Sequence, residues 1–134
     1  MSLVLADTSA WIEYLRGSDS RARAAVRERV PRRQAALTEP VVMELLAGAL
    51  SERSASGVAA MLGSFPLEPV DASFDYTAAA QIYRVCRRAG RTLRNQLDCL
   101  IAAVAIRTDL PLLHRDADFD FIARHTPLRI YEPG

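Results

Sequence analysis

Carboxylate side chains stand in this sequence at positions where a negative charge is unexpected. Two of them interrupt apolar segments with helical spacing, and the others follow apolar runs typical of buried strands. These residues are Asp7, Glu44, Asp98, Asp116 and Asp118. A carboxylate that is buried without a partner must take up a proton or lose several kcal/mol of hydration. We therefore expect a positively charged group opposite these side chains.

A divalent cation is the simplest such group if four of the carboxylates converge. Two carboxylates about 5 Å apart repel each other by roughly 3 kcal/mol at an effective dielectric constant of 20, and four multiply that cost. Oxygen ligands without histidine or cysteine suit Mg²⁺ or Mn²⁺, which keep several waters and also bind phosphate. The residue types thus predict a magnesium site that acts on phosphates.

Each carboxylate also has a purely structural explanation that the sequence leaves open. Asp7 and Asp116 stand where a helix N-cap is expected, a role worth about 1 kcal/mol. Glu44 and Asp98 could instead pair with an arginine such as Arg94, or face solvent at the end of a helix.

These residues need a scaffold that brings distant segments together, and the pattern along the chain predicts one. Apolar runs indicate strands at 2–6, 35–37, 110–113 and 128–131, with 65–70 as an edge strand or connector. Helical spacing and caps indicate helices from residue 7, over 20–30, 40–50, 51–63, 74–89, 95–106 and 116–124. Alternating strands and helices imply an α/β fold, with a parallel sheet covered on both faces. Ligands of such sheets bind beyond the carboxyl ends of the strands, where Asp7 and Asp116 stand.

Length and composition fit one globular domain over residues 1–134, because half of the residues are apolar and a quarter are charged. No apolar run approaches the roughly 20 residues that cross a bilayer, and the first residues lack the features of a signal peptide. We therefore expect a cytoplasmic protein that does not contact membranes. Cys86 and Cys99 have no metal-ligand spacing and are expected to be free, buried thiols.

All seventeen basic residues are arginine. P-loop enzymes need a lysine, as do receiver domains and haloacid-dehalogenase-type phosphatases, so the sequence excludes these classes. The arginine enrichment itself has two explanations, a GC-rich genome or selection for phosphate binding.

Four segments, in order along the chain, resemble the PIN-domain ribonucleases and, among them, the VapC toxins of bacterial toxin–antitoxin pairs. The segments are LADTSAWIEYLRG, EPVVMELLAG, LRNQLDCLIAAVAI and LLHRDADFDFIARH. The resemblance covers the whole chain and implies a PIN-like α/β/α sandwich with a mainly parallel central sheet flanked by helices. It also implies a Mg²⁺-dependent endoribonuclease toxin that hydrolyses RNA, with tRNA as a frequent target and products that carry 5′-phosphate and 3′-hydroxyl ends.

The resemblance also assigns residues to the expected site. Four acids match those that hold one or two Mg²⁺ ions, with Mn²⁺ able to substitute, and that activate a water: Asp7, Glu44, Asp98 and Asp116. Ser9 matches a hydroxyl residue that orients a carboxylate or water. Asp118 either contacts the metal ligands without binding the metal itself or caps a helix. The choice between Asp116 and Asp118 as the fourth acid stays open. Phe119 is expected in the core and Asp120 in solvent.

Partners follow from the same resemblance. RNA is expected to contact a run of arginines, although a solvated helix face explains the run almost as well: Arg84, Arg87, Arg88, Arg91 and Arg94. A VapB-type antitoxin, a homodimer and a toxin–antitoxin hetero-oligomer are expected. Trp11 is expected to pack in the core, although with Tyr14 and Leu15 it could instead line part of the groove that receives the antitoxin. His114 and His125 are expected to be structural or surface residues rather than catalysts. The alternatives are a non-toxin PIN-domain nuclease that processes RNA and a catalytically inactive binding module.

Overall fold

The centre of the molecule is a small parallel sheet. The computed structural model describes residues 2–132. Its strands are β1 (Val4–Ala6), β2 (Ala35–Ala36) and β3 (Leu112–Leu113). The strand order is β2-β1-β3, and Leu5 of β1 pairs with Ala36 on one side and Leu112 on the other. All three strands are buried, which is typical of a parallel sheet covered on both faces.

Two of the expected strands are reduced to single bridges at the edges of this sheet. The segment 128–131 pairs only through Ile130, because β3 offers a partner of just two residues. The segment 65–70 pairs only through Leu67, since Pro66 and Pro69 lack the N–H groups that a ladder needs. The expectation of a full strand over 128–131 was therefore wrong, and 65–70 is a connector.

Every expected helix is present in the described residues, with small shifts at the ends. The helices are α1 (Thr8–Arg16), α2 (Arg21–Arg29), the short 3-10 helix η1 (Val30–Arg32), α3 (Glu39–Ala47), α4 (Glu52–Leu62), α5 (Asp75–Arg88), α6 (Gln96–Thr108) and α7 (Ala117–His125). The largest shift is in α3, which ends at Ala47 rather than near residue 50. Gly90, with φ of 103°, takes the left-handed conformation that turns the chain out of α5 toward α6.

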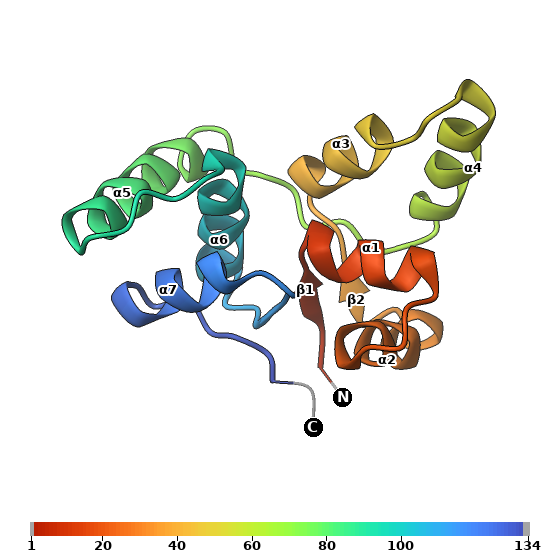
Figure 1. Cartoon of the computed structure of the whole chain (residues 1–134), viewed down its shortest axis with the longest axis horizontal. Helices are drawn as coiled ribbons and strands as arrows, with labels where there is room; N and C mark the ends of the chain where they lie inside the picture. The colour runs from red at the N-terminus through yellow and green to blue at the C-terminus, as the bar shows by residue number, and fades with distance from the viewer. Residues whose placement is uncertain (1, 133–134) are drawn as a thin grey trace.

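The helices cover the sheet from two sides, so the expected α/β/α sandwich is confirmed. Helices α5, α6 and α7 lie on one side of the strands, and α1 to α4 lie on the other (Figure 1). Helix α5 packs along α6, and α1 packs on α2. No helix among residues 2–132 is long and apolar enough to cross a membrane.

The core joins the sheet to both helical layers. Trp11 is fully buried and stacks on Phe65 with ring centroids 4.9 Å apart, so its expected packing role is confirmed. Phe119 is fully buried in the other layer, as expected. Helix α6 is buried almost without interruption from its first turn. Cys86 and Cys99 are free thiols inside this core, as expected.

A buried ion pair fixes the connector before α5. Asp75 is fully buried, and Arg107 of α6 donates to both of its carboxylate oxygens, at 2.9 Å from Nε to Oδ1. Arg107 also donates to the backbone oxygen of Pro69 at 2.8 Å. This pair ties the connector to α6, the helix that carries Asp98.

Candidate metal centre

Asp7 stands at the carboxyl end of β1 and caps α1. Its Oδ2 accepts hydrogen bonds from the Ser9 backbone N–H at 3.0 Å and from Ser9 Oγ at 2.7 Å. The N-cap explanation is thus confirmed, but it uses only one carboxylate oxygen. Oδ1 is buried and has no hydrogen-bond partner. Burial raises the pKa of Asp7, partly offset by the bonds from Ser9, and the charge of Glu44 raises it further.

Ser9 links two strand ends. Besides donating to Asp7, its Oγ accepts a hydrogen bond from the backbone N–H of Arg115 at 2.9 Å. Arg115 belongs to the loop between β3 and Asp116, and its guanidinium pairs with the buried Glu13 of α1. The loop that presents Asp116 is therefore held against α1 at two points.

Asp98 lies in the first turn of α6 and is only 7% exposed. Asn95 begins this helix, because its side chain accepts a hydrogen bond from the Leu97 N–H at 2.9 Å. The pKa of Asp98 is raised from 3.8 to about 7. Burial is the main cause, and the charges of Asp7, Asp116, Glu44 and Asp118 add to it, in that order. Half of the Asp98 side chains would thus carry a proton near neutral pH unless a cation offset the charge.

Glu44 projects from α3 and is held by two side chains that the sequence analysis did not assign to the site. Thr8 Oγ1 donates to Glu44 Oε1 at 2.7 Å, and Asn95 Nδ2 lies 3.4 Å from Oε2. Thr8 adjoins Asp7 in the sequence, which is the only local signal of its role. The arginine partner considered for Glu44 and Asp98 is wrong, since the ion pairs of Arg94 go to Asp116 and Asp118 instead.

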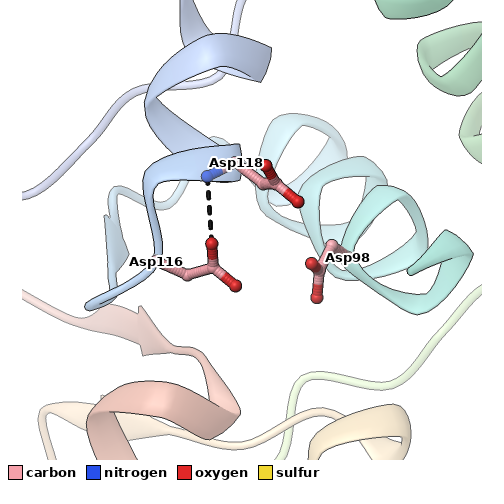
Figure 2. A group of neighbouring side chains, drawn as sticks. All are labelled: Asp98, Asp116 and Asp118. Atoms are coloured by element: carbon pink, nitrogen blue, oxygen red, sulfur yellow. Dashed lines mark hydrogen bonds between the residues drawn. The ribbon is translucent and has the colours of Figure 1, made fainter. Parts of the chain in front are cut away.

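Asp116 and Asp118 have different surroundings. Asp116 caps α7 by accepting a hydrogen bond from the Asp118 N–H at 3.0 Å, so the idea that Asp118 is the cap was wrong. Asp118 is 2% exposed, and Arg91 Nη2 donates to its Oδ1 at 2.5 Å. Its Oδ2 is buried without a hydrogen bond. Asp98, Asp116 and Asp118 each place a carboxylate oxygen within 4.8 Å of the others (Figure 2).

All four predicted acids face one cavity of about 340 Å³. Its lining comprises Asp7, Thr8, Ser9, Ile12, Glu44, Arg94, Asn95, Asp98 and Asp116. These acids come from the end of β1, from α3, from the first turn of α6 and from the loop before α7. The donor set fits a hard divalent cation, because it offers carboxylate oxygens and leaves the buried Oδ1 of Asp7 without a hydrogen bond.

The PIN-domain family model matches residues 4–125. The chain belongs to the PIN-domain family. Within it, the chain is 46% identical over 129 residues to VapC ribonuclease Mb1587 of Mycobacterium bovis, and equally so to ribonuclease VapC11 of Mycobacterium tuberculosis. Each match covers 95% of this chain and 96% of the relative. The expected membership among VapC-type PIN-domain ribonucleases is therefore confirmed.

Solved structures show the same PIN fold at low sequence identity. DNA-bound VapBC from Salmonella typhimurium matches with a TM-score of 0.75 and 21% identity, covering 98% of both chains. FitAcB from Neisseria gonorrhoeae matches with a TM-score of 0.75 and 23% identity, also covering 98% of both chains. VapC20 of Mycobacterium tuberculosis, a toxin that cleaves the sarcin-ricin loop, matches with a TM-score of 0.64 and 21% identity, covering 94% of this chain and 98% of that one.

The remaining predicted residues lie around the PIN-domain cavity rather than in it. Arg84, Arg87 and Arg88 are exposed on α5, while Arg91 is held by Asp118. His114 Nδ1 accepts a hydrogen bond from the Asp116 N–H at 2.9 Å, which supports its structural role. Asp120 is exposed, as expected.

Proposed function

We propose that this protein is a metal-dependent endoribonuclease toxin of a VapBC-type pair, and that Asp7, Glu44, Asp98 and Asp116 hold Mg²⁺, with Mn²⁺ able to substitute. The observation that carries the proposal is the convergence of these four acids, from four separate segments, on one cavity. The raised pKa of Asp98 supports it, because a bound cation would offset both the burial of this carboxylate and the charges of the acids around it. The names of the 46% identical relatives support ribonuclease activity.

The proposed mechanism is metal-assisted hydrolysis of an RNA phosphodiester. A bound divalent cation supplies Lewis acidity that lowers the pKa of a water and stabilises the charge of the transition state. Asp7 offers Oδ1, while Ser9 fixes its other oxygen. Thr8 and Asn95 hold the Glu44 carboxylate toward the same cavity. We propose that the products carry 5′-phosphate and 3′-hydroxyl ends.

Asp116, rather than Asp118, is proposed as the fourth metal ligand. Asp116 lines the cavity, whereas Asp118 is buried behind it and is already bound by Arg91. In this arrangement Asp118 acts on the site through its charge, since it raises the pKa of Asp98. Arg91 in turn holds Asp118 in place through its hydrogen bond to Oδ1.

Partners are proposed from the relatives and from the surface. The matched structures from Salmonella typhimurium and Rickettsia felis are VapBC proteins bound to DNA, which supports a VapB-type antitoxin for this chain. We also propose a homodimer within a toxin–antitoxin hetero-oligomer, tRNA as a substrate class, and RNA contacts to Arg84, Arg87 and Arg88. Cytoplasmic location is part of the same proposal.

Cleavage of a small-RNA pool by the purified, antitoxin-free chain tests this function. Wild type, Asp98→Asn and Asp19→Asn are compared in Mg²⁺ and in EDTA; Asp19 is exposed and does not line the cavity. We expect discrete fragments from wild type and Asp19→Asn in Mg²⁺ alone, and none from Asp98→Asn. Intact RNA with all three proteins, in a sample that also binds no metal, would refute the proposal.

Expression without an antitoxin tests the toxin part separately. A toxin arrests growth, and Asp98→Asn relieves the arrest. Normal growth with active wild-type nuclease in the cell extract would identify a PIN-domain nuclease that processes RNA without acting as a toxin.

A further inference from the structure

Arg94 is the only cationic residue among the described residues that line the acidic cavity. Its Nη2 lies 3.7 Å from Asp116 Oδ1, and its Nε lies 3.7 Å from Asp118 Oδ2. Both distances exceed hydrogen-bond length, and 81% of the side chain is exposed. Arg94 therefore offsets the charge of two acids without being fixed to either.

Arg91 shows the contrast. It donates to Asp118 at 2.5 Å, and its side chain is only 40% exposed. A loose, solvent-exposed ion pair contributes little stability, whereas a short bond to a buried carboxylate is costly to break. Of the two arginines near Asp118, Arg94 is thus the one that can move away from the acids easily.

The backbone around Arg94 is held, while its exposed side chain makes only the two loose ion pairs. Leu93 is 3% exposed, and Asn95 caps α6. Arg94 is therefore anchored at the rim of the cavity, within reach of a group that enters it.

We propose that Arg94 is an exchangeable counter-ion of this cavity. Without a metal it offsets the charge of Asp116 and Asp118, and when a divalent cation takes over that role its guanidinium binds the non-bridging oxygens of the RNA phosphate under attack. The second half rests on the function proposed above. A cation near these acids repels the guanidinium, and a planar guanidinium matches a phosphate with two parallel hydrogen bonds.

The first half is tested by metal affinity without RNA. Calorimetric titration with Mn²⁺ compares wild type, Arg94→Ala and the control Arg53→Ala, which removes an exposed arginine of α4 that does not line the cavity. We expect Arg94→Ala to bind Mn²⁺ roughly three- to tenfold more tightly, because a competing exposed charge is removed. Equal or weaker binding by Arg94→Ala than by Arg53→Ala would overturn the counter-ion role.

The second half is tested by cleavage at saturating Mn²⁺. We expect the initial rate of fragment formation from the small-RNA pool to fall about a hundredfold in Arg94→Ala, as for loss of one transition-state donor. Arg94→Lys keeps the positive charge but loses the two parallel N–H donors of the guanidinium. Its cleavage rate should therefore lie between those of wild type and Arg94→Ala. A rate for Arg94→Ala equal to that of Arg53→Ala would overturn the phosphate contact. A urea unfolding curve for each variant confirms that it is folded.

Failure of the underlying function gives a different pattern. If wild type binds Mn²⁺ but cleaves no RNA, the ribonuclease proposal and the phosphate contact fail together. Tighter Mn²⁺ binding by Arg94→Ala would still establish the counter-ion role in that case.

Discussion

Replacing Asp98 by asparagine is expected to stabilise the metal-free protein at pH 8. Asp98 has a folded-state pKa of about 7, against an ordinary value of 3.8. At about 1.4 kcal/mol for each pKa unit, this difference corresponds to about 4 kcal/mol as an upper bound. The asparagine side chain has nearly the same shape and carries no charge, so the variant avoids this cost.

The sign of the pH dependence follows from proton binding. Between pH 3.8 and about 7 the folded protein holds a proton on Asp98 that the unfolded chain releases. The contribution of Asp98 to the free energy of unfolding therefore falls as pH rises through this window. Above pH 7 the full cost is present, and below pH 3.8 it is absent.

Urea unfolding in EDTA at pH 4 and at pH 8 measures this effect. The free energy of unfolding of Asp98→Asn should exceed that of wild type by up to about 4 kcal/mol at pH 8 and by almost nothing at pH 4. The exposed control Asp19→Asn should match wild type at both values. If Asp98→Asn gained the same free energy of unfolding at both pH values, or lost free energy of unfolding at pH 8, the reasoning would be refuted. Added Mg²⁺ should raise the stability of wild type and of Asp19→Asn, but not that of Asp98→Asn.

Three further substitutions test the packing and the polar contacts. Thr8→Val removes the 2.7 Å hydrogen bond to Glu44 and should weaken Mn²⁺ binding about threefold to tenfold in calorimetry, with unfolding nearly unchanged; unchanged affinity would show that Glu44 needs no support. Arg107→Met leaves the fully buried Asp75 without its cation and should lower the free energy of unfolding by about 3–5 kcal/mol at pH 7; a loss below 1 kcal/mol would mean that solvent reaches this pair. Phe119→Ala should cost about 3–5 kcal/mol in the same urea assay, and a much smaller loss would contradict its place in the core.

The elements were predictable because their signals are local. Asn95, Asp7 and Asp116 each begin a helix by binding a nearby N–H, and residues of this type in front of an apolar pattern are enough to place such starts. The meeting of Asp7 and Asp116 followed from their positions beyond the carboxyl ends of parallel strands, whereas Glu44 and Asp98 stand on helices. The family resemblance then selected which acids to expect.

The contacts among the acids were not predictable, because they join segments that are far apart in sequence. Arg91 reaches Asp118 only because α5 packs against α7, and Thr8 reaches Glu44 only because α1 packs against α3. The strand expected at 128–131 failed for a similar reason, since the length of its neighbour limits how far it can pair. The local sequence pattern shows neither which distant segments pack together nor how long a neighbouring strand is.

The order of the acids along the chain has a consequence for protein synthesis. The four acids span most of the chain, from Asp7 through Glu44 and Asp98 to Asp116. The second edge of the central strand β1 is paired only when β3 is present. A ribosome-bound chain that has not yet emerged beyond residue 116 therefore lacks both the last acid and the strand that positions it. The nascent protein therefore cannot assemble the proposed metal centre until its last segments are available to fold, late in its own synthesis.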